Sequence, residues 1–226
     1  MLRKMRRLFS MILLTSIILI GFKVLPFIAK KVISSENPIA LGKTIVIDAG
    51  HGGHDGGTIG VNGSYEKDIN LEISQKIIKK LQAKGYEVIS TRDNDEYIDN
   101  IERARLANRS SSDVFLSIHC NALENNDYIS GAQVLYYPDK NKGNQDLNNK
   151  NMAETMMNSI VSATGVIDKG IIEREDLIVL NQTNMPAMVV ECGFLSNPNE
   201  EKLLLNSRYQ NKLVDSIIQG LEDYLR

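Results

Sequence analysis

The stretch TIVIDAGHGGHDGGTIG, residues 44–60, organises the rest of the chain. Its opening residues, Thr44 to Ile47, form an apolar run that predicts a buried strand, and the run stops at Asp48 in a turn rich in glycine. Two of the three histidines in the chain, His51 and His54, lie in this turn. A strand that ends in a polar, glycine-rich loop is where α/β proteins place ligands and catalytic groups. The alternative is a glycine-rich surface loop with a solvated histidine, and no G-K-[ST] motif follows that would indicate phosphate binding.

The composition is that of an ordinary globular protein. The chain has 226 residues, of which 42% are hydrophobic and 24% charged, which is enough for one sizeable core. A formal charge of −2 gives no reason to expect nucleic acid as a partner, and the absence of tryptophan argues against base-stacking platforms. Two cysteines are too few for a disulfide framework.

The N-terminus resembles a targeting segment. An uncharged run from Leu8 to Phe22 follows four basic residues: Arg3, Lys4, Arg6 and Arg7. We expect residues 1–29 to be a signal anchor or a signal peptide, and we prefer the uncleaved anchor because no good cleavage site follows. The basic flank would stay in the cytoplasm, which places the bulk of the chain outside. Residues 30–43 are predicted to be a linker, and residues 44–226 the catalytic domain.

Strands and helices alternate along this domain. Apolar residues from Ile69 to Leu81 recur at four-residue spacing, so a helix is predicted there with Glu66 at its N-terminal edge. Further strands are predicted at 86–91, 114–119, 132–137, 177–180 and 187–190, and further helices at 98–108, 152–160 and 213–225. The helix at 98–108 should turn Ile101, Ala104 and Ala107 inward. The predicted fold class is α/β: a mostly parallel, twisted sheet flanked by helices on both faces, in a single catalytic domain.

Four residues near the predicted strand ends are candidates for chemistry. His51 follows the first strand, His119 ends the third, Glu191 ends the last, and Glu66 opens the first helix. The carboxyl ends of parallel strands meet at one edge, so these side chains are expected to converge. Histidine and carboxylate ligands at three positions, with a fourth left open, are typical of a catalytic zinc site.

Each candidate also has a structural interpretation. His119 could be a core histidine bonded to backbone, and Glu66 could be a charge at a helix N-terminus. Glu191 lies between two apolar segments, where an uncompensated carboxylate is costly and needs a cation, a metal or a raised pKa.

Four motifs then carry a family resemblance. The segments IVIDAGHGG, EKDINL, SIHCNA and VVECGFLSN, in this order, resemble the zinc-dependent N-acetylmuramoyl-L-alanine amidases of the Amidase_3 family. The resemblance covers the chain from Thr44 to its end. The basic N-terminus, the lack of an added wall-binding module and the GAQVLYY stretch are most similar to the CwlD-type spore cortex amidases of endospore formers.

The resemblance implies a role for each candidate. His51, Glu66 and His119 match the zinc ligands of the family and Glu191 its catalytic glutamate, whereas His54 matches no ligand. Asp48, Arg92 and Asn121 are candidates for orienting these groups.

The implied reaction is hydrolysis of the amide bond between N-acetylmuramic acid and L-alanine of the peptidoglycan stem peptide. In a spore former it would serve cortex maturation through muramic-δ-lactam formation, and hence germination, in the space between the forespore membranes. The protein would work outside the cytoplasm, either secreted or attached to the membrane through its N-terminal segment. Because unregulated wall cleavage endangers a cell, we also expect an extracytoplasmic accessory or activator protein.

Two other functions stay open. A cysteine hydrolase could use Cys192, which adjoins Glu191, much as Cys120 adjoins His119. Neighbouring side chains on a strand point to opposite faces, so the cysteines should point away from any site that contains the histidine and the glutamate. They are expected to be buried free thiols, with a disulfide as the alternative. The second possibility is a non-catalytic wall-binding module that keeps the fold.

Overall fold

The computed structural model describes residue 40, residues 42–138 and residues 148–226. The expected targeting segment, residues 1–29, and nearly all of the expected linker lie outside these residues. In the part of the chain that is described, no helix has both the length and the apolar character needed to cross a membrane.

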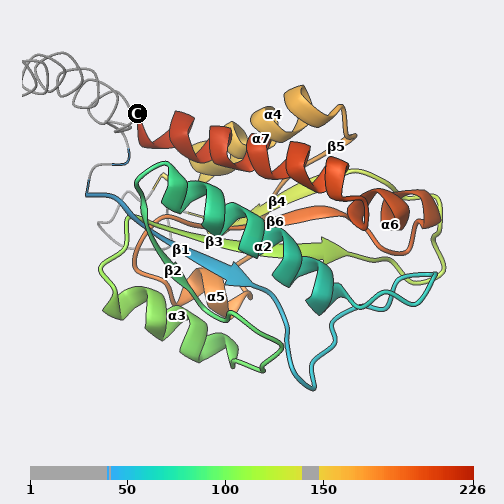
Figure 1. The fold of residues 1–226 in the computed structure, drawn as a ribbon, viewed down its shortest axis with the longest axis horizontal. Helices are drawn as coiled ribbons and strands as arrows, with labels where there is room; N and C mark the ends of the chain where they lie inside the picture. The colour runs from blue at the N-terminus through green and yellow to red at the C-terminus, as the bar shows by residue number, and fades with distance from the viewer. Residues whose placement is uncertain (1–39, 41, 139–147) are drawn as a thin grey trace, which may run out of the picture. The chain divides into compact units, whose positions relative to one another are not determined.

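The domain is built on a six-stranded sheet with the order β2-β1-β3-β6-β4-β5 (Figure 1). Its strands are β1 (Thr44–Ala49), β2 (Glu87–Ser90), β3 (Val114–Asn121), β4 (Ala132–Tyr136), β5 (Asp168–Glu173) and β6 (Ala187–Phe194). Strand β4 runs antiparallel to β6, and every other neighbouring pair is parallel. The predicted mostly parallel α/β sheet is therefore confirmed.

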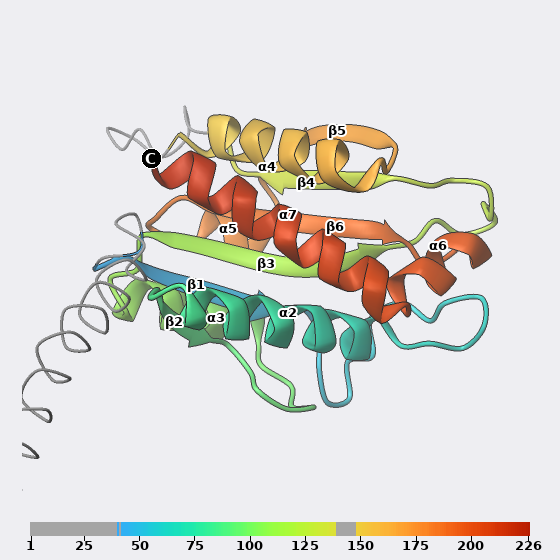
Figure 2. The ribbon, with the colours of Figure 1, turned by 45° about the horizontal axis from the view of Figure 1, so that its top comes forward.

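Helices cover both faces of the sheet, as predicted (Figure 2). One face carries α2 (Glu66–Ala83), α4 (Asn149–Thr164) and α7 (Ser207–Leu225), and the other carries α3 (Asn100–Arg109) and the one-turn α5 (Ile178–Asn181). A short helix, α6 (Pro198–Leu204), follows β6. Ile69, Ile73, Ile77 and Leu81 of α2 are at most 2% exposed, so the four-residue spacing gave the correct buried face.

Side-chain alternation divides the apolar residues into two cores. Ile45 and Ile47 of β1 pack in the larger core beneath α2, α4 and α7, whereas Val46 packs in the smaller core beneath α3 and α5. Phe115 and Val189 also belong to the smaller core. Residues an even number apart on a strand share a face, so His119 and Glu191 emerge on the side of the sheet that α3 and α5 cover.

Two predictions of secondary structure were wrong. Residues 177–180 do not form a strand, because Ile178–Asn181 is the one-turn helix α5, and the strand β5 at Asp168–Glu173 was missed. A four-residue apolar run cannot be assigned to strand or helix from periodicity alone. Here Val179 and Leu180 reach the smaller core from a helical turn, and the edge strand β5 has only intermediate or exposed residues.

The inward face of α3 was also partly wrong. Ala104 and Ala107 are buried as expected, but Ile101 is 42% exposed, and Arg103 is turned inward with only 2% exposed. Polar groups at the end of β1 attract the guanidinium, which lies among buried hydrogen-bond acceptors.

Candidate active site

Two arginines shape the loop that carries His51. Arg103 donates from Nη1 to the carbonyl of Ala49 at 2.6 Å and from Nη2 to the carbonyl of His51 at 2.7 Å. Arg92 donates to the carbonyls of Ala49 and Gly50, each at 2.9 Å. His51 itself has a φ of 60°, a left-handed conformation that is uncommon outside glycine. The loop is thus held by charged hydrogen bonds to successive carbonyl groups.

Glu66 begins α2 and is only 4% exposed. Its Oε2 accepts a hydrogen bond from the Thr58 amide at 2.9 Å, and its Oε1 accepts one from the Cys120 amide at 3.2 Å. The Asn70 side chain, one turn further along α2, also donates to Oε1. The carboxylate is therefore fixed by three separate segments of the chain.

Both histidines lie against this carboxylate. His119 Nδ1 is 2.9 Å and His51 Nε2 is 3.2 Å from Glu66 Oε1. One donor atom from each of these three residues lies within 4.8 Å of the other two. The other ring nitrogen of His51, Nδ1, is 2.8 Å from Asp55 Oδ2. A carboxylate on the far nitrogen is the usual way in which proteins orient a metal-binding histidine.

Two glycines allow the rings to come this close. A Cβ on Gly50 would lie 2.2 Å from His119 Nε2, and a Cβ on Gly57 would lie 2.6 Å from Glu66 Oε2 and 2.7 Å from His51 Cδ2. Real Cβ atoms essentially never approach other atoms so closely. The glycine-rich turn therefore makes room for the side chains of the site, in addition to permitting the turn itself.

His51, His119 and Glu66 shift the pKa values of one another. Burial alone would lower the pKa of His51, but hydrogen bonds and charge from Glu66 and Asp55 raise this pKa to about 9. Burial would likewise lower the pKa of His119, and Glu66 with Glu191 raises it. Burial would raise the pKa of Glu66, but its hydrogen bonds with the two histidines hold this pKa well below the usual range. The carboxylate and the two rings thus each favour the charged form of the other.

Glu191 lies directly across from His119. The two residues are register partners in the parallel pairing of β3 and β6. The Oε2 atom of Glu191 is buried and has no hydrogen-bond partner among the described residues. Burial, reinforced by the charge of Glu66, raises the pKa of Glu191 to about 7, although His119 opposes this shift. A carboxylate in this state can exchange a proton near neutral pH.

The structure brings together His51, Glu66, His119 and Glu191, and it leaves His54 outside. His54 is exposed, and its ring stacks on Tyr97 with centroids 4.2 Å apart. Asp55 was missed from the sequence, although its position four residues after His51 was a usable signal.

The candidate orienting residues have different roles. Arg92 and Asp48 support the loop, because Arg92 binds its carbonyls and Asp48 forms a buried ion pair with Arg103 at 2.7 Å. Asn121 instead donates to Gln133.

The two cysteines lie behind the site. Cys120 and Cys192 are free, at most 2% exposed, and belong to the larger core on the opposite face of the sheet. This confirms the expectation of buried thiols that point away from His119 and Glu191. Neither thiol lines the cavity at the site.

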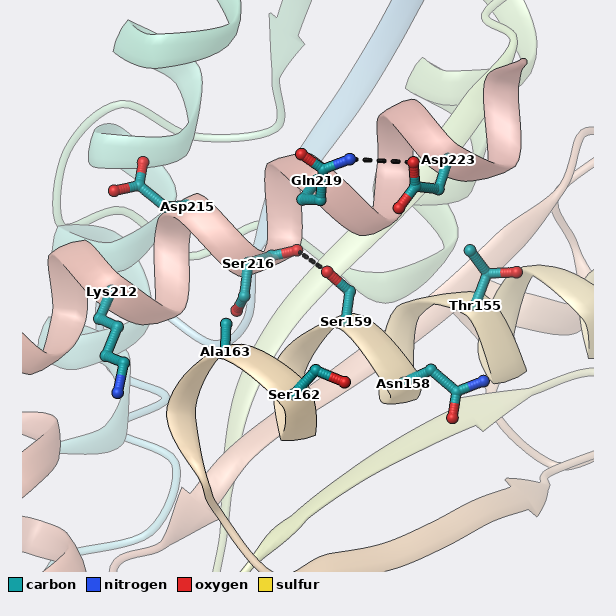
Figure 3. Close-up of a pocket in the computed structure, with 10 residues that line it drawn as sticks. All are labelled: Thr155, Asn158, Ser159, Ser162, Ala163, Lys212, Asp215, Ser216, Gln219 and Asp223. Atoms are coloured by element: carbon teal, nitrogen blue, oxygen red, sulfur yellow. Dashed lines mark hydrogen bonds between the residues drawn. The ribbon is translucent and has the colours of Figure 1, made fainter.

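A cavity of about 240 Å³ opens at the site and is lined by His51, His119, Glu191 and Arg174. A second groove, of about 830 Å³, is lined by Thr58, whose amide donates to Glu66, and by residues Leu123 to Asp127. Another cavity of about 660 Å³ lies between α4 and α7 (Figure 3), where small polar side chains such as Ser159 and Ser216 line it. That cavity is in the helical layer of the larger core and has no histidine or cysteine among its lining residues. The cavity of about 240 Å³ is therefore the candidate active site, because the histidines and Glu191 line it.

Comparisons with known proteins agree with this geometry. Residues 45–223 match the model of the Amidase_3 family, described as N-acetylmuramoyl-L-alanine amidase. A crystal structure of N-acetylmuramoyl-L-alanine amidase from Clostridium difficile 630 is 42% identical with a TM-score of 0.76, over 81% of this chain and 96% of that one.

Two further relatives have more specific descriptions. The germination-specific N-acetylmuramoyl-L-alanine amidase of Bacillus subtilis (strain 168) is 31% identical over 91% of this chain and 92% of its own length. The CwlD amidase of Clostridioides difficile, solved in complex with the GerS lipoprotein, is 32% identical with a TM-score of 0.74, over 81% of this chain and 98% of that one. The chain therefore belongs to the Amidase_3 family and is an N-acetylmuramoyl-L-alanine amidase.

Proposed function

We propose that this amidase depends on zinc, that His51, Glu66 and His119 hold the metal, and that Glu191 is the catalytic proton carrier. The observation that carries the proposal is the convergence of three donor atoms within 4.8 Å, beside a buried carboxylate oxygen with no partner among the described residues.

The donor set fits zinc in chemistry and in spacing. Neutral imidazole and carboxylate are common zinc ligands, and three protein ligands leave a fourth position open in catalytic sites. Ligands about 2.0–2.1 Å from a tetrahedral ion lie roughly 3.3 Å from one another. The distances of 2.9 and 3.2 Å from Glu66 Oε1 to the two ring nitrogens are close to that spacing.

When bound, zinc would polarise the amide carbonyl and lower the pKa of water to about 7. The residues of the chain would do the rest. Glu191 would accept the proton of the attacking water at Oε2, because this atom has no competing partner, and would pass it to the departing amine of L-alanine. Asp55 would keep the proton of His51 on Nδ1, which leaves Nε2 free for the metal.

The decisive experiment combines metal analysis with substitution of Glu191. Purified protein should contain about one zinc ion per chain, and chelation should abolish release of stem peptides from peptidoglycan. Glu191→Gln should keep the zinc and lose about 100- to 10,000-fold in rate, the typical contribution of general acid–base catalysis. Activity that survives complete metal removal would overturn the proposal.

Cys192→Ala is the matched control for the competing mechanism. The thiol is buried on the opposite face of the sheet, so a cysteine hydrolase has little support, and the variant should remain active. Inactive Cys192→Ala with unchanged zinc content and melting temperature would favour the cysteine mechanism. A non-catalytic wall-binding module would instead bind peptidoglycan without releasing peptides under any metal condition.

The biological setting is the second part of the proposal. We place the enzyme outside the cytoplasm, attached through residues 1–29 or secreted, with peptidoglycan of the spore cortex as its substrate. Similarity to a germination-specific amidase along 92% of that protein supports this setting. A deletion strain of a spore-forming host should make spores without muramic-δ-lactam and with a germination defect. Normal lactam content in those spores would contradict the cortex role.

An accessory protein is the last part of the proposal. It is supported by the similarity to an amidase that was solved with a lipoprotein. The loop from Leu123 to Ser130 is a suitable contact, because residues 123–127 of it line the groove of about 830 Å³. The isolated domain should then show weak activity that rises when the partner is added, and full activity alone would argue against a partner.

A further inference from the structure

Arg174 is a charged residue of the active-site cavity that has no role in the mechanism above. It follows β5 directly, and its backbone amide donates to the carbonyl of Tyr136 at 2.9 Å. Its side chain lines the cavity of about 240 Å³ together with His51, His119 and Glu191. Among the described residues that line this cavity, it is the one with a guanidinium or ammonium group. Because β5 is parallel to β4 and β4 is antiparallel to β6, β5 ends at the edge of the sheet opposite Glu191, and the side chain of Arg174 brings its positive charge to the cavity from that side.

The guanidinium is oriented from one side. Nε and Nη2 of Arg174 each donate to an oxygen of Asp176 at 2.8 Å, which is a two-point contact. Within the described parts of the chain, Nη1 donates to no acceptor. The side chain is 39% exposed, so a soluble group in the cavity can reach it. Arg174 is therefore held in place with one donor group available.

The other residues that line the cavity offer a bound anion few favourable contacts. Leu135, Leu177 and Val179 provide an apolar wall, and the acidic groups Asp55 and Glu191 would repel a carboxylate. Asn100 also lines the cavity, but its side-chain amide is neutral, so the charged contacts open to a carboxylate are Arg174 and the metal position.

The substrate carries such a carboxylate close to the bond that is cut. In peptidoglycan the residue after L-alanine is a D-glutamate joined through its side chain, so its α-carboxyl group is either free or converted to an amide. Two extended residues span at most about 7 Å, which keeps this group near the scissile nitrogen. It stays within reach of a small cavity that already contains the catalytic groups.

We propose that Arg174 binds the α-carboxylate of the second stem-peptide residue and makes the enzyme prefer the free acid to the amide. This inference rests on the proposed site, because it assumes that the scissile bond lies between Glu191 and the His51–Glu66–His119 cluster. The contact with Arg174 would also orient the substrate, so that the departing peptide lies on the side of the cavity formed by α5.

A second explanation predicts a different result. Arg174 could act only on Glu191, since the positive charge lowers the pKa of that carboxyl group. Loss of Arg174 would then change the rate on every substrate by the same factor. Recognition of a carboxylate instead changes the ratio between the acid and the amide.

The first test is binding, which requires no catalysis. The zinc-loaded full chain is titrated with two product dipeptides, L-alanyl-D-glutamate and L-alanyl-D-isoglutamine, by calorimetry. The wild type should bind the acid about tenfold more tightly, as expected for one hydrogen bond to a charged group. Arg174→Gln should bind the two equally, and Arg105→Gln, an exposed arginine of α3, should behave as the wild type. Equal binding of the two dipeptides by the wild type, including no binding of either, overturns the inference.

The second test is kinetic and separates this inference from the proposed function. N-acetylmuramoyl-L-alanyl-D-glutamate and its D-isoglutamine counterpart are compared by kcat/KM in the three proteins. Arg174→Gln should lower the ratio of acid to amide about tenfold while zinc content stays unchanged. An equal loss on both substrates refutes carboxylate recognition and leaves the amidase intact. Absence of hydrolysis by the wild type, together with a preference for the acid dipeptide, would instead refute the catalytic proposal alone.

Discussion

The substitution Gly50→Ala tests whether zinc binding and catalysis depend on the exact position of the His119 ring. In Gly50→Ala the new Cβ would lie 2.2 Å from both Cε1 and Nε2 of His119. Atoms in van der Waals contact are about 3.5–4.0 Å apart, so the ring and the loop must separate by more than about 1 Å. Gly50 is not among the residues with positive φ, so the effect should be steric and not a backbone strain.

The expected magnitude follows from the tolerance of metal sites. Ligand distances vary by about ±0.2 Å in a working site, so a shift of about 1 Å should weaken zinc binding at least tenfold. A displacement of this size also reduces turnover by about 100-fold. Overpacking should lower the free energy of unfolding by about 1–3 kcal/mol.

The measurements are zinc affinity, amidase rate and unfolding free energy on one set of variants. Gly63→Ala is the control, because Gly63 has a φ of 89° but no atom within 4 Å of an added Cβ. That variant should lose about 1–2 kcal/mol through backbone strain and keep its zinc affinity and rate. If Gly50→Ala keeps the zinc affinity and the amidase rate of the wild type, then the close contact between Gly50 and the His119 ring does not determine the geometry of the site.

Three further predictions concern the surroundings of the site. Arg103→Met should lower the free energy of unfolding by about 3–5 kcal/mol in urea, because it leaves the buried charge of Asp48 unpaired. Burial alone would raise the pKa of Asp48, but Arg103 keeps it below the unfolded value, so its stabilisation is present above about pH 4 and is lost as the pH falls through the folded pKa. The pKa of His51 is raised to about 9, so zinc must displace a proton, and calorimetry should record zinc affinity that rises with pH up to about 9. Glu201→Ala should speed amide hydrogen exchange in residues 60–64 and cost about 1–3 kcal/mol, because the buried carboxylate accepts hydrogen bonds from that loop.

Each of these predictions has a contradicting outcome. Arg103→Met within 0.5 kcal/mol of the wild type, roughly the range of a neutral surface substitution, would mean that the ion pair with Asp48 contributes little. Zinc affinity that is independent of pH would place the ring of His51 outside the metal site. Unchanged exchange in residues 60–64 of Glu201→Ala would show that the loop is held by other contacts.

The sequence predicted the parts of the fold that depend on long periodic patterns. The helix from Glu66 has a repeated four-residue apolar spacing that a strand does not satisfy, whereas the short apolar runs of β1 and β3 are identified as strands by their β-branched residues and by the polar segments that follow them. The convergence of His51, Glu66 and His119 was also predictable, because the carboxyl ends of parallel strands share one edge.

What could not be predicted depends on long-range polar contacts. Arg103 was assigned to no face, since a helix pattern treats arginine as a surface residue, yet it is buried by acceptors at the end of β1. The strand β5 has no fully buried residue, and its apolar residues, Ile171 and Ile172, are too short a run to predict its pairing with β4. The contact of Asp55 with His51 depends on the conformation of the loop, which turns the His51 ring toward this carboxylate.

His119 and Glu191 lie side by side only because β3 and β6 pair in one particular register. The two residues are partners in the parallel pairing of β3 with β6, and an irregularity in the pairing follows immediately after them. Because side chains alternate along a strand, a slip of one residue would place Cys192 opposite His119 and turn Glu191 into the larger core. Burial of an unpaired carboxylate there would be costly, whereas the present register puts the two small thiols in that core. The same apolar packing that stabilises the sheet therefore penalises the register in which the catalytic groups would separate.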